Sequence, residues 1–149
     1  MVLIATLLPM SPLEKRFMDD SKKNLTGSPL RDTFKQLHKA NCERSFYACD
    51  LDFILVRKVP EGILAFIDYK RINELITFSE VLAYNGLVLV APLYIIRSIT
   101  PEKGPFTIDR YLSGDWRPEP PIALVKRMVI LKDWAALNLW EGTLRTEKN

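Results

Sequence analysis

The chain has 149 residues, enough to bury a real core, and we expect residues 1–149 to form a single domain. Hydrophobic residues make up 48% and charged residues 26%, a globular balance that excludes a disordered chain. The net charge of +3 permits a polyanionic partner without requiring one. Cys42 and Cys49 have no C-x-x-C spacing, which argues against a disulfide framework and favours reduced thiols in the cytoplasm.

The N-terminal part of the chain carries few signals. Residues 2–8 are apolar, but they follow no basic stretch and are too few to cross a bilayer, so we expect a strand or a docking segment and no membrane association. A short helix is expected over residues 14–23. Ser28 and Pro29 then fit the cap and first turn of a helix that reaches about Asn41. Leu30, Phe34 and Leu37 give that helix one face to bury.

The single histidine limits two kinds of chemistry. His38 with Cys42 and Cys49 lacks a convincing fourth zinc ligand and the close spacing that zinc sites usually show. The sequence also has no G-x-S-x-G motif or comparable nucleophile context to accompany this histidine, which argues against a hydrolytic triad. We therefore expect His38 to lie on a helix surface without a catalytic role.

Residues 49–70, CDLDFILVRKVPEGILAFIDYK, alternate as two strands joined by a turn at residues 60–62. Asp50 and Asp52 share a face of the first strand, and Asp68 and Lys70 share a face of the second. If the strands pair as a hairpin, Asp52 and Asp68 meet at one end beside Lys70. Two carboxylates and an amine beside apolar side chains are costly to desolvate, and a divalent metal ion would compensate that cost.

These residues resemble the PD-(D/E)XK nuclease superfamily, in which an acid on one strand precedes a D/E-x-K tripeptide on a following strand. Asp52 would be the first acid and Asp68-Tyr69-Lys70 the tripeptide. The chain departs from the pattern in having Asp68 where Glu is usual and Leu51 where the proline stands. The resemblance covers roughly residues 31–98. It implies an α/β fold with a restriction-endonuclease-like core, a mixed central β-sheet flanked by helices in α-β-β-β-α-β order.

The resemblance also implies a chemistry. Asp52, Asp68 and the backbone carbonyl of Tyr69 would hold Mg²⁺, with Mn²⁺ as a substitute, and Lys70 would orient or help activate a water that attacks a phosphodiester of nucleic acid, expected to be DNA. Additional acids that could join the metal are Glu43, Asp50 and Glu80. Basic residues that could contact flanking phosphates are Arg57, Lys58 and Arg71, for which ordinary surface charge is an equal explanation.

After Lys70 the pattern predicts a helix from about Ile72 to Val88. Its expected packing stripe is Ile72, Leu75, Ile76, Leu82 and Ala83, with Asn73, Thr77, Glu80 and Tyr84 on the opposite, polar face. Gly86 falls on the packing stripe, where it would allow close approach to the sheet. A break at residues 91–92 and a strand over residues 93–98 follow, and a strand that begins at Leu87 is the alternative.

The remaining elements are a loop over residues 100–105, a strand over 106–112, an irregular segment over 113–121 and a strand over 122–131. Trp116 could stack on a base, although an anchor for the proline-rich segment is the commoner role. Asp133 caps a last helix with the apolar stripe Trp134, Leu137, Trp140 and Leu144. That stripe is core if covered and a dimer surface if exposed.

Three hypotheses remain open. The first is a Mg²⁺-dependent endonuclease that uses Asp52, Asp68 and Lys70 and could act as a homodimer. The second is a catalytically inactive nucleic-acid-binding or assembly module on the same fold. The third is a structural interaction protein unrelated to nucleases, in which Asp68 and Lys70 form a strand-end ion pair.

Overall fold

The computed structural model describes residues 29–42 and 49–145, and the chain divides into two compact units, residues 1–46 and 47–149. The first unit contributes helix α2, Pro29–Asn41, with the predicted bounds. Its apolar side chains Leu30, Phe34 and Leu37 are exposed, so the burial expected for this face is not found among the described residues. Glu43 and the elements expected within residues 1–27 lie outside the described residues.

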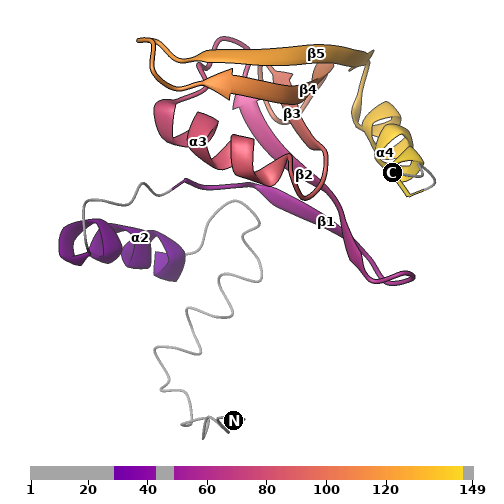
Figure 1. Cartoon of the computed structure of the whole chain (residues 1–149). Coiled ribbons are helices and arrows are strands. Elements are labelled where there is room, and N and C mark those ends of the chain that lie inside the picture. Colours follow the sequence, from indigo (N-terminus) through magenta and orange to yellow (C-terminus); the bar gives the residue numbers. More distant parts are fainter. Residues whose placement is uncertain (1–28, 43–48, 146–149) are drawn as a thin grey trace, which may run out of the picture. The chain divides into compact units, whose positions relative to one another are not determined.

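The second unit holds a five-stranded mixed sheet and two helices (Figure 1). In chain order they are β1 Phe53–Arg57, β2 Gly62–Arg71, α3 Phe78–Leu87, β3 Leu93–Ser98, β4 Phe106–Asp115, β5 Ile122–Leu131 and α4 Trp134–Thr143. The strands lie in the order β1-β2-β3-β4-β5. Only the β2–β3 pair is parallel, and α3 connects these two strands. The predicted α/β class and mixed sheet are therefore confirmed.

The predicted hairpin is present. Phe53 pairs with Ile67 and Arg57 with Gly62, so β1 and β2 run antiparallel around a turn at residues 58–61. Gly62, with a φ of +158°, leads from this turn into β2. Asp50 and Asp52, expected inside the first strand, lie before it, because the ladder begins only at Phe53.

Two apolar clusters lie on opposite faces of the sheet, since they take alternate residues of each strand. One combines Ala65, Ile67, Tyr94, Ile96, Phe106, Ile108 and Leu131 with Leu137 and Leu144 from α4. The other combines Phe66, Leu93, Ile95 and Tyr111 with Tyr84 from α3. The sheet thus has a helix on each face, and the α3 face carries the even-numbered residues of β2, including Asp68 and Lys70.

The helix expected from Ile72 was placed too early and in the wrong phase. It begins at Phe78, because Thr77 caps it: the Thr77 hydroxyl accepts a hydrogen bond from Glu80 N, and the Glu80 carboxylate accepts one from Thr77 N. Val81 and Tyr84 are its buried residues. Gly86, predicted on the packing stripe, is exposed and has no atom within 4 Å of a built Cβ.

Strand β4 also differs from the prediction, since it continues through Ser113 and Gly114 to Asp115 and pairs there with the start of β5. A Cβ on Gly114 would lie 2.3 Å from the Tyr111 hydroxyl and 2.9 Å from Val81 Cγ1, so only glycine fits between sheet and helix. Strands β3 and β5 have the predicted bounds, and the alternative strand from Leu87 is wrong.

Helix α4 is capped by Asp133 as predicted. Leu137 and Leu144 are buried, and Trp140 packs edge-on against Tyr94. Trp134, predicted in the same stripe, remains 55% exposed. Among residues 29–42 and 49–145, no helix is both long and apolar enough to cross a membrane.

Candidate functional site

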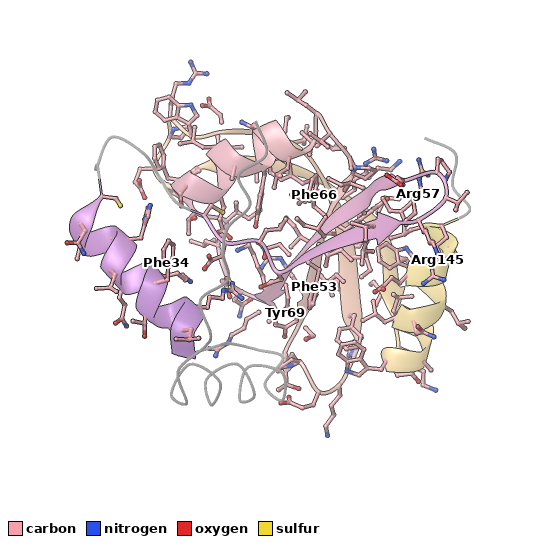
Figure 2. The ribbon with its side chains drawn as sticks, turned by 90° about the horizontal axis from the view of Figure 1, so that it is seen from below. Phe34, Phe53, Arg57, Phe66, Tyr69 and Arg145 are labelled. Carbon is pink, nitrogen blue, oxygen red and sulfur yellow. The ribbon has the colours of Figure 1, made fainter. Side chains whose placement is uncertain are left out.

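The end of the β1–β2 hairpin opposite the turn brings the two predicted acids together. Asp52 Oδ2 accepts a hydrogen bond of 2.7 Å from the backbone N–H of Tyr69, which holds this exposed carboxylate against β2. The register that pairs Phe53 with Ile67 places Asp52 opposite Asp68. The hydrogen bond and charge of Asp52 act on the Asp68 carboxyl, so the two groups are neighbours. Figure 2 shows Phe53 and Tyr69 at this end of the hairpin and Arg57 at the other.

Lys70 lies beside Asp68 and is only 2% exposed. Its Nζ is 2.5 Å from Glu80 Oε2, 3.3 Å from Glu74 Oε2 and 3.8 Å from Asp68 Oδ2. Three carboxyl groups therefore surround one ammonium group, and Asp52 neighbours one of them, Asp68. Burial alone would make such an excess of negative charge unfavourable, and a proton or a cation relieves it.

Helix α3 supplies two side chains to this group. Glu80 and Tyr84 are four residues apart and so project from the same side of the helix. The Tyr84 hydroxyl donates a hydrogen bond to Asp68 Oδ2 and lies 3.0 Å from Glu80 Oε2. Glu80 uses its other oxygen, Oε1, to accept a hydrogen bond of 2.9 Å from Thr77 N. The cap that starts the helix thus also orients the carboxylate that binds Lys70.

The pKa values of these groups follow from burial and charge. Burial, and then the Asp52 carboxyl, raise the pKa of Asp68 from 3.8 to about 7, although the Tyr84 hydrogen bond acts in the opposite direction. Burial would lower the pKa of Lys70, but the Glu80 hydrogen bond and the surrounding carboxylates raise it above its ordinary value. Burial and the bond to Asp68 raise the pKa of Tyr84 as well. At neutral pH these shifts keep Lys70 a cation and Tyr84 a donor, and they favour the protonated form of Asp68 more than an ordinary carboxyl would.

A metal ion at this site would find few protein ligands. Among the residues that the structure describes, no three His, Cys, Asp or Glu side chains are grouped so that they could hold a metal ion. Asp52 and Asp68 offer a pair of hard carboxylate oxygens, which suits Mg²⁺, an ion that keeps several waters and takes one or two carboxylates plus substrate phosphate. Burial first, and then the neighbouring Asp52, make the ionised form of Asp68 costly, and a bound cation would reduce that cost.

The other predicted residues divide into near and distant ones. Arg71 follows Lys70 at the end of β2, and its carbonyl accepts a 2.8 Å hydrogen bond from Arg97 Nη1. Asp50 is exposed and precedes β1. Arg57 donates to Pro60 O at the hairpin turn, with Lys58 next to it, about 17 Å along the strand from Asp52 at 3.3 Å per residue. The structure therefore does not bring Arg57 and Lys58 to the acids.

The charges of this site also act on the Cys49 thiol. Burial first, and then Glu80, Asp68 and Asp50, raise its pKa to about 11. The raised pKa favours the protonated thiol near neutral pH, which is unfavourable for a thiolate nucleophile.

The sequence interpretation missed the role of Tyr84 and assigned Glu80 to a polar face. The signal that could have helped is the T-x-x-E pattern of residues 77–80, which marks where the helix begins and so excludes Ile72, Leu75 and Ile76 from its packing stripe. No protein-family model, curated protein or solved structure matches the chain.

Proposed function

We propose that the protein is a metal-dependent nuclease that hydrolyses phosphodiester bonds of nucleic acid, with DNA as the expected substrate. The observation that carries this proposal is the contact between the Asp52 and Asp68 carboxyls beside Lys70, with the pKa of Asp68 raised to about 7. A pair of adjacent acids that cannot both ionise at low cost is the arrangement that a divalent cation stabilises.

The fold supports the same proposal. An antiparallel hairpin, a helix and a strand parallel to the second hairpin strand follow one another in β1, β2, α3 and β3. This is the β-β-α-β portion of the α-β-β-β-α-β order expected for a restriction-endonuclease-like core. Between α2 and α3 the described residues contain two strands where that order has three.

Each residue has a distinct task in the proposed reaction. Asp52 and Asp68 would hold Mg²⁺, with Tyr69 O as a further ligand, and the bound ion would neutralise the scissile phosphate and lower the pKa of a bound water. Lys70, a cation at neutral pH, orients the attacking water and stabilises negative charge that develops on the phosphate. Because it already carries its proton, Lys70 does not act as a general base.

Supercoiled-plasmid nicking in Mg²⁺ or Mn²⁺ tests the proposal. We expect activity that EDTA removes, and a loss of about 100-fold or more in Lys70→Ala, the loss typical of removing one group that stabilises transition-state charge. Asp68→Asn should be equally inactive, because it removes a charged metal ligand and keeps the shape. Lys132→Ala, at an exposed lysine after β5, is the matched control. Equal nicking by wild type and Lys70→Ala would disprove the proposed chemistry.

One observation favours the inactive nucleic-acid-binding module as a second candidate. The Lys70 ammonium is 2% exposed and already has three carboxylate partners, as a structural ion-pair network would have. That candidate predicts oligonucleotide binding in EDTA without nicking under any metal condition. A structural protein unrelated to nucleases predicts instead that calorimetry with Mn²⁺ gives no binding heat, in wild type as in Asp68→Ala.

A further inference from the structure

A cavity of about 240 Å³ opens on the α3 face of the sheet beside the acid pair. Its walls are Leu75, Ile76, Ile95, Pro120, Pro121, Ala123 and Val125, and its charged residues are Glu74, Arg97 and Asp109. Glu74 lines the cavity and also contacts the site around Lys70, since its Oε2 is 3.3 Å from Lys70 Nζ. A substrate held at the acid pair would therefore pass the mouth of this cavity.

The strand register fixes how the cavity and the acid pair are related. Asp68 pairs with Ile95, Ile95 with Asp109, and Asp109 with Arg127. Laterally paired residues point to the same face, so this row crosses the α3 face from the acid pair to the floor of the cavity. With neighbouring strands about 4.8 Å apart, Asp68 and Asp109 lie about 10 Å from one another. That separation is comparable with the length of one nucleotide.

The floor of the cavity combines an acceptor with a donor. Asp109 is 7% exposed, and its Oδ1 accepts a 2.5 Å hydrogen bond from Arg127 Nε. A carboxylate can accept about four hydrogen bonds, so Asp109 keeps capacity for a ligand. Arg97 uses Nη1 for the carbonyls of Arg71 and Glu74, at 2.8 and 2.5 Å, and its guanidinium carries further donors on Nε and Nη2.

Apolar walls above a floor with one acceptor and one donor suit a flat ring with a polar edge. A volume of about 240 Å³ falls below the roughly 300–1,000 Å³ of pockets for drug-sized ligands, so it suits one ring system. Guanine offers a carboxylate two adjacent donors, N1–H and the N2 amino group, and offers an arginine the O6 acceptor. Adenine and cytosine present a single amino group, and thymine a single imino group.

We propose that this cavity binds a guanine base next to the phosphate held at the acid pair. Asp109 accepts from the N1–H and N2 amino groups, and Arg97 donates to O6. The proposal rests on the proposed function, since it takes the ligand to be a nucleic-acid strand. It gives the site a preference for the base beside the cleaved bond.

The test is binding without catalysis. Fluorescence anisotropy in EDTA would compare three labelled 12-mers: oligo-dT, the same strand with one central dG, and the same strand with inosine there, which lacks the N2 amino group. We expect the dG strand to bind about fivefold or more tighter than oligo-dT, the lower range for one bidentate base contact, with inosine in between. Equal affinities for all three strands would overturn the base pocket and leave the nuclease proposal intact.

Variants separate recognition from folding. Asp109→Asn should abolish the dG preference, because an amide cannot accept from both donors, and Val125→Phe should abolish it by filling the cavity without changing charge. Arg127→Ala removes the ion pair of Asp109 and keeps its carboxylate, so the preference should persist. Lys126→Ala, on the neighbouring exposed residue, is the control for general phosphate attraction. Loss of preference in Arg127→Ala but not in Asp109→Asn or Val125→Phe would disprove recognition by the cavity.

The outcomes also separate the two proposals. A dG preference in EDTA without nicking in Mg²⁺ would support the base pocket and contradict the nuclease function. Failure to bind any of the strands in EDTA would contradict the base pocket, and plasmid nicking in Mg²⁺ would then test the nuclease function by itself.

Discussion

Asp68 and Lys70 lie two residues apart on one face of β2, and their surroundings raise both pKa values. The effect on charge is opposite, because a raised pKa keeps Lys70 charged and favours the neutral form of Asp68. Tyr84 moderates this effect, since its hydroxyl donates to the ionised carboxylate and so lowers the pKa of Asp68. The Tyr84 hydroxyl therefore makes the ionised form of Asp68 less costly.

Tyr84→Phe should raise the pKa of Asp68 above about 7, because the ionised carboxylate loses the hydrogen bond that the Tyr84 hydroxyl donates to it. At pH 7 a larger fraction of Asp68 is then protonated, and Mn²⁺, which requires the ionised form, binds more weakly. Calorimetric titration with Mn²⁺ from pH 6 to 9 measures this effect. We expect the midpoint of binding to move to higher pH in Tyr84→Phe, with affinity recovered at pH 9. A midpoint unchanged by the substitution would contradict this role.

At the scale of elements, the start of α3 and the site are one structure. Glu80 caps the helix with Oε1 and binds Lys70 with Oε2. Thr77→Ala should destabilise the fold by about 0.5–2 kcal/mol, the usual cost of losing an N-cap side chain. It should also weaken Mn²⁺ binding, because Glu80 N loses the Thr77 hydroxyl as its acceptor, the first turn of α3 loosens, and the Glu80 carboxylate that binds Lys70 moves with it. Denaturant unfolding and calorimetry measure the two effects.

Helix α4, which is also capped by a side chain, provides the matched control for this substitution. Asp133 caps α4 through a 2.9 Å hydrogen bond from Ala136 N, far along the chain from the acid pair. Asp133→Ala should cost a similar amount of stability and leave Mn²⁺ affinity unchanged. If both variants weakened Mn²⁺ binding equally, the coupling between the α3 cap and the site would be refuted.

The sequence predicted the hairpin because period-2 alternation identifies its strands, and it placed Asp68 and Lys70 on one face of β2 for the same reason. Asp52 lies before β1, and the Tyr69 N–H holds it beside β2, a contact that alternation does not predict. The phase of α3 was not predicted, because Ile72, Leu75 and Ile76 have helical spacing and shift the apparent start by about two turns. Because Ile72, Leu75 and Ile76 lie before the helix, a packing stripe drawn through them selected the wrong side, and Tyr84 and Glu80 were assigned to the polar face.

The sequence did not predict the extension of β4 to Asp115, for a different reason. Residues 113–115, Ser-Gly-Asp, have turn composition, and only the close packing at Gly114 shows why they remain in the sheet. The cavity could not be predicted at all, since its walls come from residues 74–76, β3, β4 and the segment before β5. Such a site depends on register between strands, which local pattern does not determine.

The stability of the whole molecule should depend on pH through the same acid pair. Between 3.8 and about 7, folded Asp68 binds a proton that the unfolded chain has released, so the free energy of unfolding falls as pH rises through this range. Glu80 acts oppositely: burial opposes its ionisation, but Lys70 lowers its pKa below 4.5, so its contribution is present above pH 4.5 and is lost as pH falls further. Without metal, stability should therefore be greatest near pH 5.

Asp68→Asn isolates the acid pair, because asparagine resembles the protonated carboxyl and can still accept from Tyr84. Denaturant unfolding in EDTA should show wild type losing a few kcal/mol relative to Asp68→Asn between pH 5 and pH 8, as expected for a pKa raised by this much. Adding Mg²⁺ at pH 8 should restore wild type and leave the variant unchanged, because a ligand that binds only the folded state stabilises it. Parallel pH profiles for the two proteins, with no response to Mg²⁺, would show that the carboxyl pair neither carries the proposed charge nor binds the cation.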